Sequence, residues 1–326
     1  MKAIVVTGSS GPDSLEPRDV PEPSPSSEEI VVQIHSAGVN FADVRAAQGK
    51  YPGGPKPPFV AGREFAGVIE TTGERVMGYS QHSAFAEKIA SPRGLLFPAP
   101  AQWDFEHCAA FPVNYLTAWL AYWKAGLVKG GVEDPSPTRA SKRPRVLIHA
   151  AAGGVGTAAV EIGKQLGIET FGTASTPEKL ERLKELGLTH PINYRSEDFE
   201  ARVNEITNGE GVDAVFDGLG GEYTGKSVRC CGFLGRVILF GSASGDNPKV
   251  NLGQLYLKGT SLHGLWLSKL VSNPELIRSA LDSMKPWIDS GALQPQVGMV
   301  LPLREAAEAY RALLERRNYG KIVLTL

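Results

Sequence analysis

The sequence predicts an α/β protein with two domains, a doubly wound parallel sheet and a smaller β-rich domain to which both chain ends contribute. An apolar run at 145–148 (RVLI) is followed by a glycine-rich turn at 151–156 (AAGGVG). The next apolar residues recur at helical spacing, at Val155, Ala159, Ile162 and Leu166. Strand-like and helix-like stretches then alternate, whereas both ends of the chain carry short β-like runs.

The N-terminal part, to about residue 116, favours a small all-β barrel, because Gly, Pro and Ser separate its short β-like runs. The expected strands are 3–6, 29–34, 67–70, 75–78 and 84–89. Residues 104–125 have apolar positions at helical intervals. Pro112 lies inside this stretch and predicts two helices rather than one.

The stretch after the glycine turn predicts a doubly wound sheet of the Rossmann type. The expected strands are 169–173, 191–193, 212–217, 236–240 and 261–265, and the expected helices are 177–186, 196–207, 222–231 and 274–290. The tail returns to β character, with strands at 297–301 and 321–326 around a helix at 304–316. We therefore expect one domain from 1–116 with 291–326, and a second from 117–290.

Composition indicates a globular protein of the cytoplasm. Hydrophobic residues make up 42% and charged residues 21%, and the formal net charge of −1 gives no reason to expect a nucleic-acid partner. No apolar run is long enough for a secretory signal or a membrane span. The three cysteines (Cys108, Cys230 and Cys231) are expected to be buried thiols, and the six histidines lack the spacing of metal ligands, so we expect no metal.

An insertion at 130–144 (GGVEDPSPTRASKRP) precedes the glycine turn. It contains several basic residues but no aromatic residue, so we expect a solvated, mobile loop rather than a nucleic-acid site.

The glycine turn predicts a dinucleotide site, because a strand, a glycine turn and a helix follow one another. Its residues are Gly153, Gly154, Val155 and Gly156, with Ala151 in place of the first glycine of the pattern G-x-G-x-x-G. An NAD site would place an acidic residue at the end of the second strand, where this chain has 173–176 (TAST). Lys179 follows in the first helical turn, where a cation is unfavourable unless an anion such as the 2′-phosphate of NADPH lies beside it. A lysine that points to water fits these local residues equally well.

Four joined motifs resemble the zinc-independent medium-chain dehydrogenase/reductase superfamily, in its quinone oxidoreductase branch. They are 112–118 (PVNYLTA), 149–157 (HAAAGGVGT), 171–175 (FGTAS) and 189–194 (THPINY). The likeness covers essentially the whole chain and is closest to the subgroup that includes a synaptic-vesicle membrane protein. It implies a discontinuous GroES-like β-barrel domain and a homodimer formed through the nucleotide-binding domain. The apolar residues 237–240, expected at a sheet edge, are compatible with such a dimer.

The resemblance implies hydride transfer without a metal. Where zinc members have a ligand cysteine after Gly-Val and a Gly-His-Glu motif, this chain has Asn40 and Arg63. In the family, the asparagine at the place of Asn40 lies near the nicotinamide. Tyr51, in 48–52 (QGKYP), matches a tyrosine that donates a proton in the related enoyl-thioester reductases. A packing tyrosine with a satisfied hydroxyl is the other interpretation of Tyr51.

The resemblance also implies the cofactor contacts. Ser175, Lys179 and Tyr194 match positions that hold the adenosine 2′-phosphate of NADPH. The positions that match the nicotinamide half are Thr117, Gly241, Ser242, Trp266 and Asn318. The segment 69–75 is shorter than in the family, and 247–257 is unusual.

We therefore expect an NADPH-dependent reductase of quinones or α,β-unsaturated carbonyl compounds. Two alternatives remain. One is an enoyl-thioester reductase, and the other is a protein that binds NADPH without catalysis as a membrane-associated or scaffold component.

Overall fold

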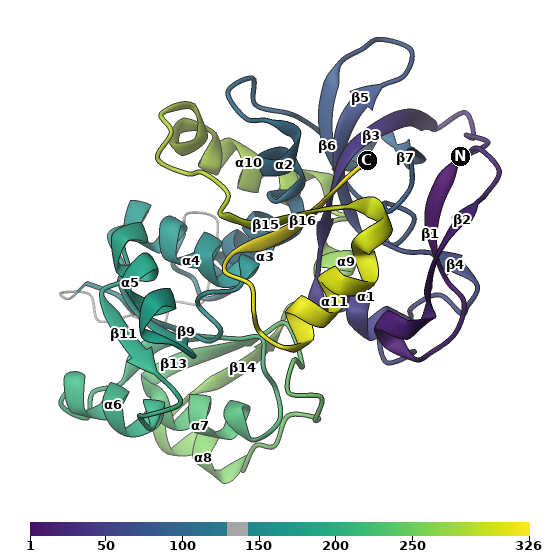
Figure 1. Ribbon diagram of the computed structural model, residues 1–326. Coiled ribbons are helices and arrows are strands. Elements are labelled where there is room, and N and C mark those ends of the chain that lie inside the picture. Colours follow the sequence, from purple (N-terminus) through teal and green to yellow (C-terminus); the bar gives the residue numbers. More distant parts are fainter. Residues whose placement is uncertain (129–142) are drawn as a thin grey trace. The chain divides into compact units, whose positions relative to one another are not determined.

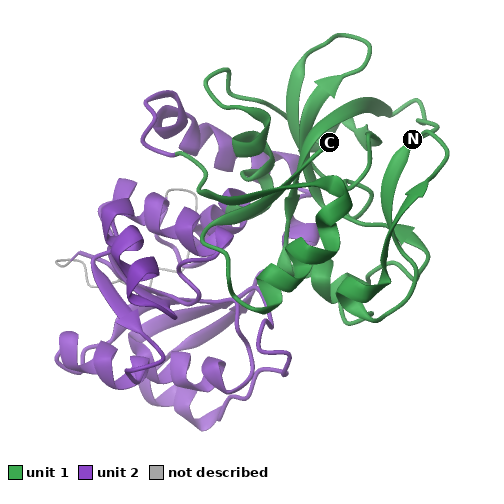
Figure 2. Cartoon of the chain, in the orientation of Figure 1, with its two compact units in different colours: residues 1–114, 294–326 green, residues 115–293 purple. Residues whose placement is uncertain are grey.

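The computed structural model describes residues 1–128 and 143–326. They form two compact units, the first from residues 1–114 and 294–326 and the second from 115–293 (Figure 1 and Figure 2). The expectation of a mobile loop at 130–144 concerns residues that lie, apart from 143 and 144, outside the described part of the chain.

The first unit is built on a seven-stranded sheet. Its path is β15 (Val297–Pro302), β16 (Lys321–Thr325), β3 (Glu29–Val39), β5 (Glu64–Ile69), β6 (Arg75–Tyr79) and β8 (Leu96–Pro98), and β7 (Lys88–Pro92) pairs with β3. All pairs are antiparallel except β15 with β16. A smaller antiparallel sheet has the order β2 (Leu15–Asp19), β1 (Lys2–Val6) and β4 (Phe59–Val60).

The two ends of the chain share one core in this unit. Strand β16 lies between β15 and β3, so the C-terminal segment completes the sheet that the N-terminal segment begins (Figure 1). Buried Val6 and Val39 pack in the same cluster as Tyr310 and Leu324. The helices of this unit are α1 (Phe41–Ala47), α2 (Phe105–Ala109) and α11 (Ala306–Leu314).

One expected strand of this unit is wrong in part. Residues 84–89 do not form one strand, because β7 begins at Lys88 and Ala86 makes only an isolated bridge to Ala3. Ser83 has a left-handed backbone (φ 76°), and the amide of Phe85 donates to the carbonyl of Ala61 (2.8 Å). These contacts turn the chain before the ladder with β3 can start.

The second unit contains a parallel six-stranded sheet. Its order is β11 (His190–Asn193), β10 (Glu169–Ala174), β9 (Arg145–Ile148), β12 (Val212–Asp217), β13 (Cys231–Leu239) and β14 (Ser261–Gly264). This is the strand order of a Rossmann sheet. With the β-rich first unit, it confirms the predicted fold class.

Helices cover both faces of this sheet. The helices of the described chain that remain are α3 (Pro112–Lys124), α4 (Gly154–Gln165), α5 (Pro177–Leu186), α6 (Phe199–Ile206), α7 (Glu222–Cys230), α8 (Gly253–Lys258), α9 (Leu267–Leu270) and α10 (Pro274–Asp289). Helices α4 and α5 pack together on one side of the sheet, and α6, α7 and α8 pack on the other (Figure 1). The expected break between two helices near Pro112 is confirmed, because α2 ends at Ala109 and Pro112 begins α3.

The expected edge strand at 237–240 is wrong. Strand β13 lies between β12 and β14, and Val237 and Ile238 are fully buried. Among the described strands, β11 and β14 are the two edges of this sheet, and Leu262 of β14 keeps 38% of its surface exposed. An unbroken apolar run is typical of a parallel strand that is covered on both faces, which is what β13 is.

Candidate functional site

The candidate cofactor residues of the second unit follow the carboxyl ends of its strands. The glycine turn follows β9, Ser175 follows β10, Tyr194 follows β11, Gly241 and Ser242 follow β13, and Trp266 follows β14. Because all six strands are parallel, these ends share one edge of the sheet. In doubly wound sheets, ligands bind at this edge.

The glycine turn is shaped by backbone contacts that leave no space for a side chain. A Cβ at Gly156 would lie 2.4 Å from the carbonyl oxygen of Ala150 and 2.5 Å from Cα of Ala151. At Gly153 the nearest atom to a Cβ is 3.3 Å away. Gly153 is also the N-cap of α4 and has no side chain that could bond the first N–H groups of this helix. Such a helix end can bind an anion.

A hollow lies beside this turn in the second unit. The turn and the loops after β12 and β13 line it, with contributions from Ala150, Gly153, Val155, Gly218, Leu219 and Phe240. The lining is mostly apolar. Such a surface suits a flat ring better than a charged group.

His149 is connected to the glycine turn by a chain of hydrogen bonds. The hydroxyl of Ser227 donates to the carbonyl of Tyr223 (2.8 Å), so it accepts from Nε2 of His149 (2.9 Å). Nδ1 of His149 then faces the hydroxyl of Thr173 (3.4 Å), which accepts the amide of Ala150 (3.2 Å). A neutral imidazole fits this pattern, with Nε2 as the donor to Ser227 and Nδ1 as the acceptor from Thr173.

Burial lowers the pKa of His149, although the nearby carboxylate of Asp217 acts in the opposite direction. Asp217 itself accepts the amides of Leu219 (2.8 Å) and Gly220 (3.0 Å) and the hydroxyl of Thr224 (2.7 Å). Its carboxylate therefore fixes the loop that forms one side of the hollow.

The carboxyl ends of β10 and β11 bring together the residues proposed to bind phosphate. Ala174 and Asn193 are paired in register, so Ser175 and Tyr194 follow at neighbouring positions. The amide of Tyr194 donates to the carbonyl of Ala174 (3.2 Å). Lys179 lies in the first turn of α5, where its amide donates to the N-cap hydroxyl of Thr176 (3.4 Å).

The remaining candidate positions are placed as follows. Trp266 is partly exposed at the start of α9, with the ammonium of Lys269 5.8 Å from its ring centroid. Thr117 is buried in α3. Asn318 belongs to the first unit, and its amide donates to the carbonyl of Gly320 (3.0 Å).

Asn40 lies in the first unit within a buried polar cluster. Its Nδ2 donates to Oε1 of Glu64 (2.9 Å) and to the carbonyl of Gly38 (3.4 Å). Its Oδ1 accepts from Nζ of Lys321 (2.7 Å). Both amide hydrogens of Asn40 are thus used, which leaves the side chain one acceptor position and no donor.

An ion pair between Glu64 and Lys321 forms the centre of this cluster. Both side chains are almost completely buried. Nζ of Lys321 also lies 3.4 Å from Oδ1 of Asn114, and Oε2 of Glu64 accepts the amide of Val113 (2.7 Å). Each charge is therefore hydrogen-bonded as well as paired, which a buried ion pair needs to be tolerated.

A second ion pair joins the cluster to Tyr51. Nε of Arg63 lies 3.3 Å from Oδ1 of Asp43, and the guanidinium carbon of Arg63 lies 4.0 Å from the ring centroid of Tyr51. Oδ2 of Asp43 accepts the amide of Asn40 (2.8 Å) at the start of α1. Burial raises the pKa of Asp43 to about 6, against the opposing effect of Arg63.

Asp43, Arg63 and Lys321 take part in this cluster although the sequence did not predict their roles. The spacing of Asn40 and Asp43 before a helix is a signal for a capping pair, and it could have been recognised. Nothing local marks Lys321, which reaches Glu64 from the last strand of the chain.

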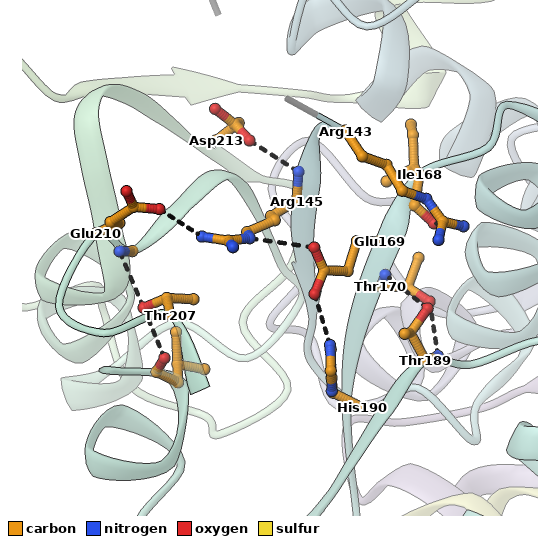
Figure 3. Close-up of polar contacts among 12 residues, drawn as sticks. Arg143, Arg145, Ile168, Glu169, Thr170, Thr189, His190, Thr207, Glu210 and Asp213 are labelled. Atoms are coloured by element: carbon orange, nitrogen blue, oxygen red, sulfur yellow. Dashed lines mark hydrogen bonds and ion pairs between the residues drawn. The ribbon is translucent and has the colours of Figure 1, made fainter. Parts of the chain in front are cut away.

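The opposite, amino edge of the parallel sheet carries a separate polar network (Figure 3). Arg145, at the start of β9, contacts Glu169 and Glu210 (3.1 Å each). Nε2 of His190 lies 2.7 Å from Glu169. Partial burial acts to raise the pKa of Glu169, but hydrogen bonds from His190 and Arg145 outweigh it and lower the pKa. This network joins three strands far from the glycine turn.

Within residues 1–128 and 143–326, no group of three or more His, Cys, Asp or Glu side chains is arranged to hold a metal ion. No helix in the same part of the chain is both long and apolar enough to cross a membrane.

Family models match both units. The GroES-like domain of alcohol dehydrogenases matches residues 26–89, and the zinc-binding dehydrogenase model matches residues 154–285. These matches define an oxidoreductase with a Rossmann domain and a GroES-like domain. The chain belongs to the medium-chain dehydrogenase/reductase superfamily, in its quinone oxidoreductase and VAT-1-like branch, as its motifs predicted.

Relatives and solved structures resemble the chain over nearly its whole length. The synaptic vesicle membrane protein VAT-1 homolog of Homo sapiens is 32% identical, covering 99% of this chain and 86% of that protein. The quinone oxidoreductase of Thermus thermophilus, also solved in complex with NADPH, has a TM-score of 0.87 and 34% identity, with 100% of both chains covered. The quinone oxidoreductase of Escherichia coli complexed with NADPH has a TM-score of 0.88 and 29% identity, again with 100% of both chains covered.

Proposed function

We propose that this protein is an NADPH-dependent reductase of quinones or α,β-unsaturated carbonyl compounds that works without a metal. The observation that carries the proposal is the carboxyl edge of the parallel sheet. Ser175 and Tyr194 follow paired residues at the ends of β10 and β11, and Lys179 lies in the first turn of α5. An NAD site would have an acidic residue at the end of β10. The NADPH complexes of two similar quinone oxidoreductases support the same choice of cofactor.

We assign NADPH binding to residues 117–290 and substrate binding to 1–116 with 291–326. The free N–H groups at the start of α4 would hold the pyrophosphate at Gly153, Gly154, Val155 and Gly156. Ser175, Lys179 and Tyr194 would hold the 2′-phosphate. The residues assigned to the nicotinamide half are Thr117, Gly241, Ser242, Trp266 and Asn318.

When bound, NADPH supplies a hydride from C4 of its nicotinamide. Hydride addition to a conjugated carbonyl leaves negative charge on the carbonyl oxygen, which a proton donor must neutralise. We assign this role to the Tyr51 hydroxyl, which gives up its proton and then regains one from solvent. Asn40 has no free N–H group, so its part is to accept one hydrogen bond and to hold its surroundings in place.

A substrate panel tests the function. NADPH and NADH oxidation are measured separately with quinones, α,β-unsaturated ketones and enoyl thioesters. We expect turnover with NADPH and a quinone or enone, and a lower kcat/KM with NADH. The Lys179→Ala variant should lose at least about tenfold in NADPH affinity, the size of one lost charge-assisted contact, with NADH affinity unchanged.

Other results of the panel would contradict the proposal. Turnover of enoyl thioesters alone would identify an enoyl-thioester reductase. Tight NADPH binding without oxidation by any compound would favour a scaffold role, and equal use of both cofactors would remove the role of Lys179. An unchanged kcat in Tyr51→Phe across enones and quinones would remove Tyr51 from the acid role.

We also propose that the protein forms a homodimer through β14. This strand is, with β11, one of the two edges of the parallel sheet among the described strands, so one row of its backbone N–H and C=O groups faces away from the sheet. A second copy related by a two-fold axis would pair with this row.

A further inference from the structure

We propose that Arg63 is the positioning residue for Tyr51, and that its guanidinium group fixes the tyrosine ring so that the hydroxyl points at the substrate. This inference rests on the acid role given to Tyr51 in the proposed function.

Arg63 is buried and ion-paired, although its Nε makes no hydrogen bond to a described residue. Only 4% of its surface is exposed, and its Nε faces Oδ1 of Asp43 at 3.3 Å. Its carbonyl accepts the amide of Ser80 (2.7 Å). The preceding Gly62 has φ 92°, and a Cβ there would lie 2.2 Å from the ring of Phe85. Only glycine fits at position 62, next to Arg63, in this backbone conformation.

Asp43 connects Arg63 to the rest of the cluster. One carboxylate oxygen faces Arg63, and the other accepts the amide of Asn40 at the start of α1. Asp43 thus links the guanidinium group of Arg63 to the start of α1. The other end of this helix leads into the segment that contains Tyr51.

Tyr51 lies in a segment that has no regular structure of its own. Between α1, which ends at Ala47, and β4, which begins at Phe59, the chain forms only turns, one of them closed by the amide of Gly54 on the carbonyl of Tyr51 (3.0 Å). The guanidinium group, 4.0 Å from the ring centroid, provides a contact from a different part of the unit. A planar guanidinium group stacks on an aromatic face, whereas an ammonium group is a compact charge on a flexible stem.

The orientation of a proton donor affects the rate directly, because a small displacement of a catalytic group removes much of its effect. Loss of the stacking contact should therefore lower kcat and leave KM nearly unchanged. The tyrosine ring is still present in such a variant, but its orientation is no longer fixed.

A double-mutant cycle between Arg63→Met and Tyr51→Phe tests this inference, with the quinone or enone that the panel finds to be reduced fastest. We expect Arg63→Met to lower kcat about 2- to 30-fold, the range that corresponds to a cation–π contact. In the Tyr51→Phe background, the same change should have almost no further effect on kcat, because no hydroxyl remains to be oriented.

Arg63→Lys separates positioning from stability. Lysine keeps a positive charge opposite Asp43, so we expect thermal stability near that of the wild type, with a kcat almost as low as that of Arg63→Met. Arg145→Met is the matched control, because it removes a partly buried, ion-paired arginine at the amino edge of the other unit (Figure 3). It should lower stability without changing kcat.

A fluorine-labelled tyrosine spectrum gives a readout that does not need turnover. The resonance of Tyr51 is the one missing from Tyr51→Phe, and we expect it to shift in Arg63→Met and Arg63→Lys but not in Arg145→Met. An unshifted Tyr51 resonance, or an equal loss of kcat from Arg63→Met in both backgrounds, would overturn the role of Arg63. If Tyr51→Phe keeps the wild-type kcat while the resonance still shifts, the acid role in the proposed function fails instead, and Arg63 only packs the ring.

Discussion

At Asp43, three features of the candidate site meet. This carboxylate caps α1 through the amide of Asn40, pairs with Arg63 and is buried in the cluster around Glu64 and Lys321. Burial raises its pKa, and so does the charge of Glu64, whereas Arg63 and Lys321 lower it, with a net result of about 6. Burial raises the pKa of the Tyr310 hydroxyl, and the charge of Asp43 acts in the same direction.

This raised pKa predicts an unusual pH dependence of stability. In the unfolded chain the carboxyl titrates near 3.8, so between about pH 4 and pH 6 the folded protein binds more protons than the unfolded one. The contribution of Asp43 to the free energy of unfolding therefore falls as the pH rises through this window, which is opposite to the usual carboxylate. The difference of roughly two units between the pKa of Asp43 in the folded and unfolded states corresponds to about 3 kcal/mol in the free energy of unfolding.

The Asp43→Asn variant tests this, because asparagine can still accept the amide of Asn40 but does not titrate. Chemical denaturation from pH 4 to pH 8 should show the variant gaining stability relative to the wild type as the pH rises from 4 to 6. Parallel curves for the two proteins would mean that Asp43 titrates alike in both states.

Local spacing could predict only part of the candidate site. Gly153, Gly156 and Lys179 follow a strand or open a helix, so the sequence alone indicates their place at the sheet edge. The contact of Arg63 with Tyr51 joins two segments without regular structure, and the ion pair of Lys321 with Glu64 joins strands β16 and β5 from distant parts of the chain. Such contacts depend on how side chains pack, and no spacing rule contains them.

At the scale of the element, the glycine turn between β9 and α4 is the most sensitive feature. A methyl group at Gly156 would meet backbone atoms of Ala150 and Ala151 that cannot move without shifting the turn. We expect Gly156→Ala to cost about 1–3 kcal/mol of stability, a typical overpacking cost, and to weaken NADPH binding at least about tenfold.

Gly153→Ala is the control for this substitution. Its Cβ would lie 3.3 Å from the carbonyl oxygen of Ala150, a tight contact but less severe than those at Gly156, so its melting temperature should fall less than that of Gly156→Ala. Melting curves and NADPH titrations of both variants check the difference. A Gly156→Ala protein with wild-type stability and affinity would show that the turn can adapt.

Most elements could be predicted from periodicity and breakers. The helix expected at 177–186 coincides with α5, because Pro177 starts it and Gly187 ends it. The strand expected at 84–89 and the edge expected at 237–240 failed for a common reason. Pairing with neighbours decides where a ladder starts and which strand lies outside, and an apolar run carries no information about its neighbours.

At the scale of the whole molecule, the proposed dimer makes a prediction about the β14 edge. The Leu262→Lys variant places a charge on an edge strand, where it should block pairing with a second copy. Sedimentation should show a dimer for the wild type and a monomer for this variant.

Val300→Lys is the matched control, because Val300 is 49% exposed on β15, an edge strand of the seven-stranded sheet in the first unit. This variant should remain a dimer. A wild-type protein that sediments as a monomer, or a Leu262→Lys variant that stays dimeric, would contradict pairing through β14.

Direct hydride transfer from NADPH to a conjugated carbonyl compound is tested most directly by the fate of a deuterium label. NADPH deuterated at C4 of the nicotinamide, on each face in turn, is reacted with an α,β-unsaturated ketone, and the product is analysed by mass spectrometry. We predict that one of the two labelled cofactors delivers its deuterium to the β-carbon of the ketone, and that turnover persists after treatment with a chelator. Turnover that leaves the product without deuterium from either cofactor, or no NADPH oxidation at all, would contradict the claim.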